Sequence, residues 1–453
     1  MGLGTVISGG RLLVTAELVA HSTYIELERP EEGPKTTARL EALDEECNLA
    51  VLRPEDPGIL REMRPLPLEN GATTGSRLDI LQLEPNGAAA LTPATVTTVA
   101  VMPYPAEGSS YLLYRAAANI PQREGSFVVP ALFRGGLAGL VMRYDARVQT
   151  AEIIPAPLIA RFLKESAKSG FHGLARAGLT WEEARGPNLR AWLGAEREKG
   201  GVYVDSVDPG GPAERAGLRR GDLLLRVAGR PLDGEGNYND PRHGKTTFSN
   251  LASMESAPGD PMEIAYFRSS GEGTGTLGTA TLTLAGRNLA SEISPSRLEG
   301  EEVPYRFLGG LLFQELSRPY LREWGQNWRT ESPQNLLYLD TFQQEFAGKK
   351  RRFVILSAVL PSPQTIGYED LSNRMVERIN GREILSLADV DEAARHPVEG
   401  FHRIELEGDT GPIFLNAATL QEEEARIRAQ YAIPAPSSSS SVRPLPNKGK
   451  TGI

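Results

Sequence analysis

The chain has 453 residues, of which 40% are apolar and 24% charged, and its formal net charge is −9. These values are typical of a globular protein with room for about three domains of roughly 150 residues, and the negative charge argues against nucleic acid as a partner. No apolar run reaches the roughly 20 residues of a membrane-spanning helix, so we expect no integral membrane segment. A single cysteine, Cys47, excludes an internal disulfide, and no histidine has metal-ligand spacing; we therefore expect no metal and no cofactor.

The first part of the chain alternates short apolar runs with Gly, Pro and Asn turns, a spacing typical of an antiparallel barrel or sandwich. The predicted strands are residues 11–15, 23–28, 49–53, 78–83, 94–102, 110–116, 127–133 and 136–144. The chain begins inside a predicted strand at Val6 and Ile7, so we expect a leader and a first strand to be missing. An amphipathic helix predicted over 157–169 ends this part.

The second part, residues 171–287, centres on the segment 201–232. Within it, Pro212 suits the first position of a short helix, and Gly217 suits a left-handed helix cap after which Leu218 folds back onto the core. Gly221 and Asp222 then predict a turn into the next strand.

The third part, residues 303–433, is predicted to contain a strand over 352–360 and a helix over 387–395. Between them, Asn380-Gly381 is a strong signal for a tight hairpin turn. Residues 434–453 are rich in Ser and Pro and form a low-complexity tail that cannot bury a core.

The run from Pro212 to Asp222 resembles the PDZ domain of HtrA/Deg proteases. The first part is then similar to the family's trypsin-like protease domain at 2–7, 13–15, 46–52 and 154–159, and the third part resembles a second, degenerate PDZ domain at 319–321, 367–369 and 433–434. The resemblance implies a mainly β fold with α+β modules: a trypsin-like double β-barrel followed by two PDZ-like domains. It places the barrel in 1–168, the PDZ domains in 169–288 and 303–433, and the tail in 434–453.

The family cleaves peptides with a Ser-His-Asp triad, and the resemblance aligns other residue types with all three members. Leu18 stands at the histidine, Asn48 at the aspartate and Phe127 at the serine. A leucine cannot accept the serine proton, and an amide lacks the charge that steadies an imidazolium. We therefore predict a pseudoprotease.

A shifted triad has two fallback candidates, His21 and Ser126. A one-residue shift within a strand turns a side chain to the opposite face, which argues against them. Val128 and Val129 also replace the paired glycines of the family's oxyanion loop, and β-branched residues are expected to resist positive φ.

What remains is peptide binding, in which a PDZ domain adds an extended segment to an exposed strand edge. A turn at 177–180 and a facing helix over 246–254 supply the residues that the resemblance assigns to this site: Ala177, Gly178, Leu179, Thr180, Phe248 and Leu251. The spacing of Phe248 and Leu251 is equally that of core residues, so a core role stays open. Asp44, Glu45 and Glu46 are interpreted as a solvated acidic loop.

Three functions remain open from the sequence. The first is a catalytically inactive protein that binds peptide or unfolded-protein segments, in protein quality control or as a scaffold. The second is a weak or conditional serine endopeptidase, and the third is a regulatory subunit of an active homologue. The resemblance is also compatible with a homo-oligomer, and it favours a periplasmic or otherwise extracytoplasmic bacterial location.

Overall fold

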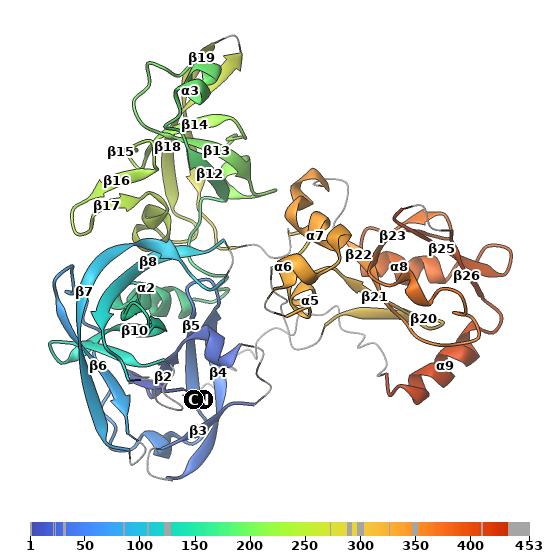
Figure 1. Cartoon of the computed structure of the whole chain (residues 1–453), viewed down its shortest axis with the longest axis horizontal. Coiled ribbons are helices and arrows are strands. Elements are labelled where there is room, and N and C mark those ends of the chain that lie inside the picture. The colour runs from blue at the N-terminus through green and yellow to red at the C-terminus, as the bar shows by residue number, and fades with distance from the viewer. Residues whose placement is uncertain are drawn as a thin grey trace, which may run out of the picture. The chain divides into compact units, whose positions relative to one another are not determined.

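The computed structural model describes residues 2–433, apart from 21, 23, 30–32, 85–86, 107, 122–127, 272, 288–291, 297–302, 326, 347–351 and 409–410. The chain divides into two compact units, Met1–Asn288 and Leu289–Ile453 (Figure 1). The tail residues 434–453 and the site candidates His21, Ser126 and Phe127 lie outside the described residues.

The first unit begins with a five-stranded antiparallel sheet in the order β1-β2-β5-β4-β3. Its elements are β1 (Thr5–Ile7), β2 (Arg11–Val14), α1 (Ala16–Val19), β3 (Glu26–Glu28), β4 (Lys35–Asp44), β5 (Leu49–Pro54) and the 3₁₀ turn η1 (Pro57–Leu60). A closed six-stranded barrel follows in the order β10-β11-β8-β7-β6-β9. It comprises β6 (Arg77–Leu83), β7 (Ala89–Pro103), β8 (Ser110–Ala118), β9 (Pro130–Phe133), β10 (Gly136–Asp145) and β11 (Thr150–Pro155).

The helix α2 (Ala156–Ser166) closes the barrel segment, as its apolar spacing predicts. Its Leu158, Ile159 and Phe162 are fully buried and pack in one cluster with Leu13 and Leu113 from the two sheets. The helix therefore joins the cores of both sheets.

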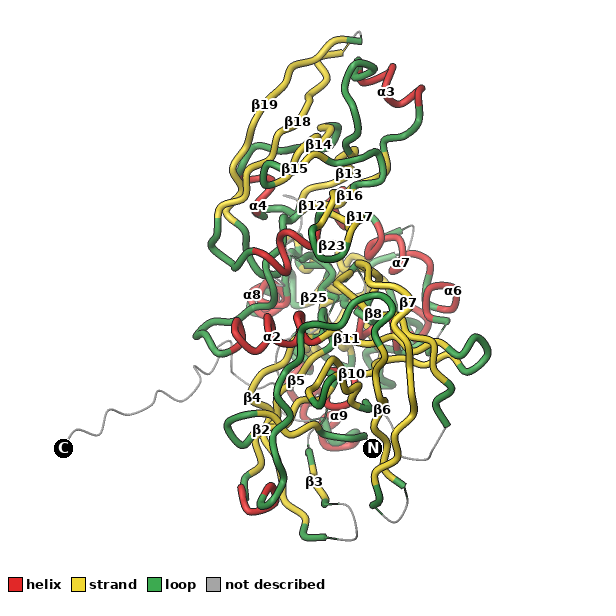
Figure 2. Tube along the Cα trace, turned by 90° about the vertical axis from the view of Figure 1, so that its left-hand side faces the viewer, coloured by secondary structure: helices red, strands yellow, loops and turns green. Residues whose placement is uncertain are grey.

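The rest of the first unit is a sheet in the order β12-β13-β14-β18-β19, with β15 paired to β14 and a separate β16-β17 hairpin. The elements are β12 (Leu179–Glu183), α3 (Pro187–Leu193), β13 (Val202–Val207), α4 (Pro212–Arg215), β14 (Asp222–Val227), β15 (Arg230–Pro231), β16 (Asn237–Asp240), β17 (Gly244–Thr247), the π-helical turn η2 (Leu251–Glu255), β18 (Pro261–Gly271) and β19 (Thr274–Thr283). Figure 2 labels these strands together with α3 and α4.

The predicted helix stop in this segment is confirmed. Pro212 begins α4, and Gly217 has φ +80°, so the chain leaves the helix through a left-handed residue. The N–H of Leu218 then donates to Ala213 O at 3.0 Å, and the Leu218 side chain is buried in the core. Asp222 follows directly and begins β14.

The second unit has a sheet in the order β20-β21-β22-β23-β25-β26, with β24 paired to β23. Its elements are β20 (Tyr305–Leu308), β21 (Leu311–Glu315), α5 (Arg318–Arg322), α6 (Trp328–Glu331), α7 (Gln334–Thr341), η4 (Gln343–Phe346), β22 (Val354–Val359), η5 (Glu369–Leu371), β23 (Arg374–Ile379), β24 (Arg382–Glu383), α8 (Leu387–Ala394), β25 (Phe401–Leu406), β26 (Ile413–Asn416) and α9 (Leu420–Gln430). The predicted hairpin turn is confirmed, since Asn380 and Gly381 have φ of +53° and +79°.

The two units share one strand order. The path β12-β13-β14-β18-β19 with β15 on β14 corresponds to β21-β22-β23-β25-β26 with β24 on β23. The difference is at the first edge, because β20 pairs with β21 through the tight turn Gly309-Gly310, whereas among the described residues β12 pairs only with β13. The β12 edge is therefore open where its counterpart β21 is covered by a strand.

Candidate functional site

Leu18 lies on α1 and is half-buried. It packs against an apolar cluster that includes Leu12, Val14 and Val19. The position that the resemblance assigns to a proton-accepting histidine is thus part of a hydrophobic core.

Asn48 is fully buried and is held by both ends of its amide. Its Oδ1 accepts from Glu17 N at 3.0 Å, and its Nδ2 donates to Glu17 Oε2 at 3.0 Å. Its backbone has φ +54°, a left-handed conformation that asparagine tolerates better than most residues. Asn48 therefore fixes the start of α1 beside Leu18.

The expectation that the valines resist positive φ is wrong for Val128, which has φ +62°. This backbone costs a β-branched residue roughly 1–2 kcal/mol. The side chain packs partly buried against the barrel core, which offsets part of that strain. Val129, by contrast, is buried and is absent from the residues with positive φ in the described chain.

Replacing Asn48 by aspartate is expected to lower the free energy of unfolding by about 2 kcal/mol at pH 7. The new carboxylate still accepts from Glu17 N but loses the donated bond and lies against the Glu17 carboxylate. Repulsion and burial raise the pKa of the new carboxyl, so the loss is present above that pKa and disappears as falling pH protonates it. Urea unfolding at pH 7 and pH 4 measures the difference. The double variant Asn48→Asp/Glu17→Gln restores a donor and should recover most of the stability at pH 7; no recovery would contradict this account.

The interpretation of 44–46 as a solvated loop is wrong, since Asp44 and Glu46 are both buried. Glu46 Oε1 accepts from Arg176 Nη1 at 3.1 Å and from Arg287 Nη1 at 2.6 Å, and Glu46 Oε2 accepts from the Tyr111 hydroxyl at 3.2 Å. Burial, and then the Glu46 charge, raise the pKa of Tyr111 well above its usual value. Burial of charge demands such pairing. The contacts connect residues beside the β12 sheet to the turn between β4 and β5 and, through Tyr111 of β8, to the barrel.

A second contact, a hydrogen bond from a charged side chain to a backbone carbonyl, joins the same two parts of the first unit. Arg161 of α2 donates to Ser256 O beside η2, and it lies 3.5 Å from the buried carboxylate of Glu165. The two ties act at different places, so we expect the barrel and the β12 sheet to move as one body.

A cavity of about 380 Å³ lies between these two parts of the first unit. The barrel side contributes Glu46, Val101 and residues 108–111. The β12 side contributes residues 175–181, 247–249, Ala252, Ser253, Met262 and Ile264. The wall on the β12 side is largely apolar, with Arg176 and Glu46 adding charge at one end.

The loop at the head of the cavity depends on Gly178. Its φ is +69°, and a Cβ there would lie 2.7 Å from Pro212 Cδ, so both backbone and space require glycine. Ala177 O accepts from Ala213 N at 3.1 Å and Gly178 O from Asp208 N at 2.9 Å. Within the described ranges the Gly178 N–H has no acceptor, which leaves it available to a ligand.

The structure brings five of the six predicted peptide-site residues to this cavity: Ala177, Gly178, Leu179, Thr180 and Phe248. Leu251 is absent from the lining; it is 1% exposed and belongs to the core of the β12 sheet. The predicted helix also starts later than expected, because 244–247 form β17. Sequence reasoning missed Trp181, whose ring centroid lies 5.5 Å from that of Phe248.

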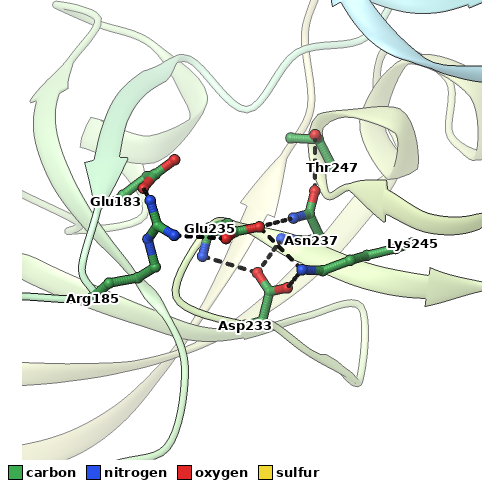
Figure 3. Close-up of polar contacts among 7 residues, drawn as sticks. All are labelled: Glu183, Arg185, Asp233, Glu235, Asn237, Lys245 and Thr247. Atoms are coloured by element: carbon green, nitrogen blue, oxygen red, sulfur yellow. Dashed lines mark hydrogen bonds and ion pairs between the residues drawn. The ribbon is translucent and has the colours of Figure 1, made fainter.

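An ionic network holds the segment that leads into Phe248 (Figure 3). Lys245 lies 2.8 Å from Asp233 Oδ2 and 3.0 Å from Glu235 Oε2, and Arg185 bonds Glu235 at 2.9 Å. Burial acts to raise the pKa of Asp233, but hydrogen bonds from Lys245 and from two backbone N–H groups hold that pKa below its usual value. The network connects β17 to the end of β12, so it fixes both sides of the cavity.

Comparisons with known proteins agree with this architecture. Family models of the PDZ domain match residues 203–240 and 295–440. The putative mitochondrial protease Do-like 3 of Arabidopsis thaliana is 23% identical over 439 residues, which cover 96% of this chain and 74% of the relative. The chloroplastic protease Do-like 2 of the same plant is 26% identical over 392 residues, covering 85% and 62%. The chain is therefore similar to HtrA/Deg-type, Do-like proteases with PDZ domains.

The chain accordingly has a mainly β fold with barrel-like sheets and PDZ domains, and the relatives that it resembles are named as proteases. Among solved structures it is similar to the HtrA-type protease AlgW with a decapeptide, with 21% identity, a TM-score of 0.49, and coverage of 63% of this chain and 83% of that one. The plant relatives carry mitochondrial and chloroplastic names, so the preference for a bacterial compartment gains no support from them. Within the described segments every helix is too short or too polar to cross a bilayer.

Proposed function

We propose that this HtrA/Deg-like protein binds extended peptide or unfolded-protein segments along β12 and does not cleave them. The observation that carries the proposal is the open β12 edge, which borders an apolar cavity and ends at a loop with a free N–H on Gly178. An incoming strand would pair with β12, and the loop would take its terminal carboxylate. Residues 169–288 are thus proposed as the binding domain, beside a scaffold at 1–168, a second PDZ-like domain at 303–433 and a tail at 434–453.

The absence of cleavage is supported by the surroundings of two triad positions. Leu18 offers only apolar contacts, and Asn48 is already engaged at both amide ends by Glu17. Loss of triad members typically costs on the order of 10⁶ in turnover. A protein in this condition retains binding alone, which suits a role as a scaffold or in protein quality control.

Gly178→Ala is expected to weaken binding of a fluorescein-labelled peptide with an apolar C-terminus at least tenfold, measured by fluorescence anisotropy. The added methyl group meets Pro212 and disturbs the loop. Gly210→Ala is the matched control, because Gly210 has a similar φ of +64° but open space around it; its affinity should stay within about twofold. A peptide with an amidated C-terminus should bind the unaltered protein more weakly. Equal peptide affinities of the two variants would argue against peptide binding in the cavity beside β12.

Proteolysis is tested separately, with full-length protein, unfolded casein and a fluorophosphonate probe. We expect binding of casein without cleavage and no labelled serine. Labelling that disappears in Ser126→Ala would instead establish the weak endopeptidase. Because the binding and cleavage assays are independent, failure of one leaves the other interpretable.

A further inference from the structure

A second cavity lies on strands β14, β18 and β19, separate from the cavity beside β12. Its volume is about 680 Å³. Its lining, which we call the basic basin, consists of Arg197, Glu198, Lys199, Leu225, Arg226, Pro231, Ala265, Leu277, Gly278 and Thr279. None of these residues lines the peptide cavity.

Strand register explains how the floor of the basin forms. Arg226 pairs with Pro231 on one side and with Ala265 on the other, and Ala265 pairs with Thr279. These four residues therefore form one row across β15, β14, β18 and β19. Leu277 of the edge strand β19 stands beside this row, with 66% of its surface exposed.

The helix α3 and the loop after it cover the neighbouring part of the same sheet. Leu193 and Ala195 pack against Leu223 and Phe267 there, and Figure 2 shows α3 to one side of β18 and β19. The basin is the part of this surface that α3 leaves open.

The wall that carries Arg197 and Lys199 is held in place by Arg190. Arg190 donates to Ala184 O at 2.7 Å, to Glu198 O at 2.9 Å and to Gly200 O at 2.6 Å. Three bonds from one guanidinium fix the loop's backbone, so its two exposed cations are presented at a defined place.

The basin has an excess of positive charge. Arg197, Lys199 and Arg226 are exposed, and within the described residues none of them lies within ion-pair distance of a carboxylate. Arg226 Nη2 donates only to a backbone oxygen, Gly229 O at 3.1 Å. In a chain of net charge −9, a lining that carries three cations and one carboxylate, Glu198, is a local reversal of sign.

We propose that the basic basin binds an acidic polypeptide segment that also carries apolar side chains. Its carboxylates would meet Arg197, Lys199 and Arg226, and an apolar side chain would cover Leu277. A nucleic acid fits less well, because the surrounding negative surface repels a long polyanion while three cations neutralise little of it.

The test uses full-length protein and a labelled probe made of three Glu-Glu-Leu-Glu repeats, acetylated and amidated so that the terminal-carboxylate site is not engaged. The triple variant Arg197→Gln/Lys199→Gln/Arg226→Gln should weaken binding about tenfold, and Leu277→Ala about threefold. The control triple Lys164→Gln/Arg219→Gln/Arg242→Gln removes the same charge from exposed positions outside the basin and should change the affinity less than twofold. A probe with Gln in place of Glu should bind weakly to every variant.

Gly178→Ala should leave binding of the acidic probe unchanged, which separates this proposal from the peptide groove. Equal affinities of the two triple variants would overturn the proposal. So would a single-stranded oligonucleotide that binds more tightly than the probe and loses affinity in the basin variant. A third contrary result would be self-association through the basin in sedimentation without any binding of the probe. The partner would then be a second copy of this chain and not an acidic segment.

Discussion

Glu46→Gln is expected to lower the free energy of unfolding of the first unit by about 3 kcal/mol, because a neutral amide removes the buried negative charge that Glu46 places against two partly buried guanidinium groups. The Glu46 side chain is only 5% exposed, and Arg176 and Arg287 are 30% and 16% exposed. Urea denaturation of the full chain, followed by tryptophan fluorescence, measures the change.

The matched control is Glu41→Gln, which removes a carboxylate 3.0 Å from Arg53 at an exposed site. Exposed pairs contribute little, so this variant should unfold close to the unaltered protein. If both substitutions lower the free energy of unfolding by the same amount, the buried ion pairs of Glu46 do not contribute more to stability than an exposed pair.

Asp222→Asn should have an effect of similar size, a loss of about 3 kcal/mol. Asp222 is fully buried and receives Arg268 Nε and Nη2 at 2.6 and 2.7 Å and Arg219 N at 2.9 Å. Burying an unpaired charge costs much more free energy than burying a charge that is paired and hydrogen-bonded. The variant keeps the volume of the side chain but leaves Arg268 without its counter-ion.

Asp205→Asn serves as the control for Asp222, since Asp205 pairs with Arg220 at 3.4 Å with both side chains largely exposed. Thermal unfolding by circular dichroism should separate the two variants clearly. A stable Asp222→Asn protein would mean that Arg268 relaxes to solvent at little cost.

Much of the fold could be predicted from short sequence motifs, because the turns and helix caps that they specify depend on only a few neighbouring residues. Gly217 adopts its left-handed cap and Asn380-Gly381 its turn, since few residues reach positive φ without strain. The strand β4 was missed because its exposed positions carry Lys35, Arg39 and Glu41, and it shows no clean alternation. The helix predicted over 246–254 was wrong at its start, because 246 and 247 belong to β17, which pairs with β16. No local sequence pattern indicates that pairing.

Long-range contacts account for the errors at the site. Glu46 looks like a solvated acid until Arg287, 241 positions away, is brought to it by the fold. Val128 takes a left-handed backbone that its own preferences oppose, and the strand β9, which pairs with β10, begins two residues after it. The amide of Asn48 is likewise understood only with Glu17 beside it. The alignment of Phe127, Ser126 and His21 stays a prediction, since they lie outside the described residues.

The strand β20 has a consequence for stoichiometry. It occupies the flank of β21 that corresponds to the open flank of β12, and Arg306 of β20 bonds Asp391 of α8 at 2.6 Å. An incoming peptide would have to break that strand pairing and that ion pair before it could align with β21. A peptide titration of this chain should therefore saturate at one equivalent, although the chain carries two sheets of the same connectivity.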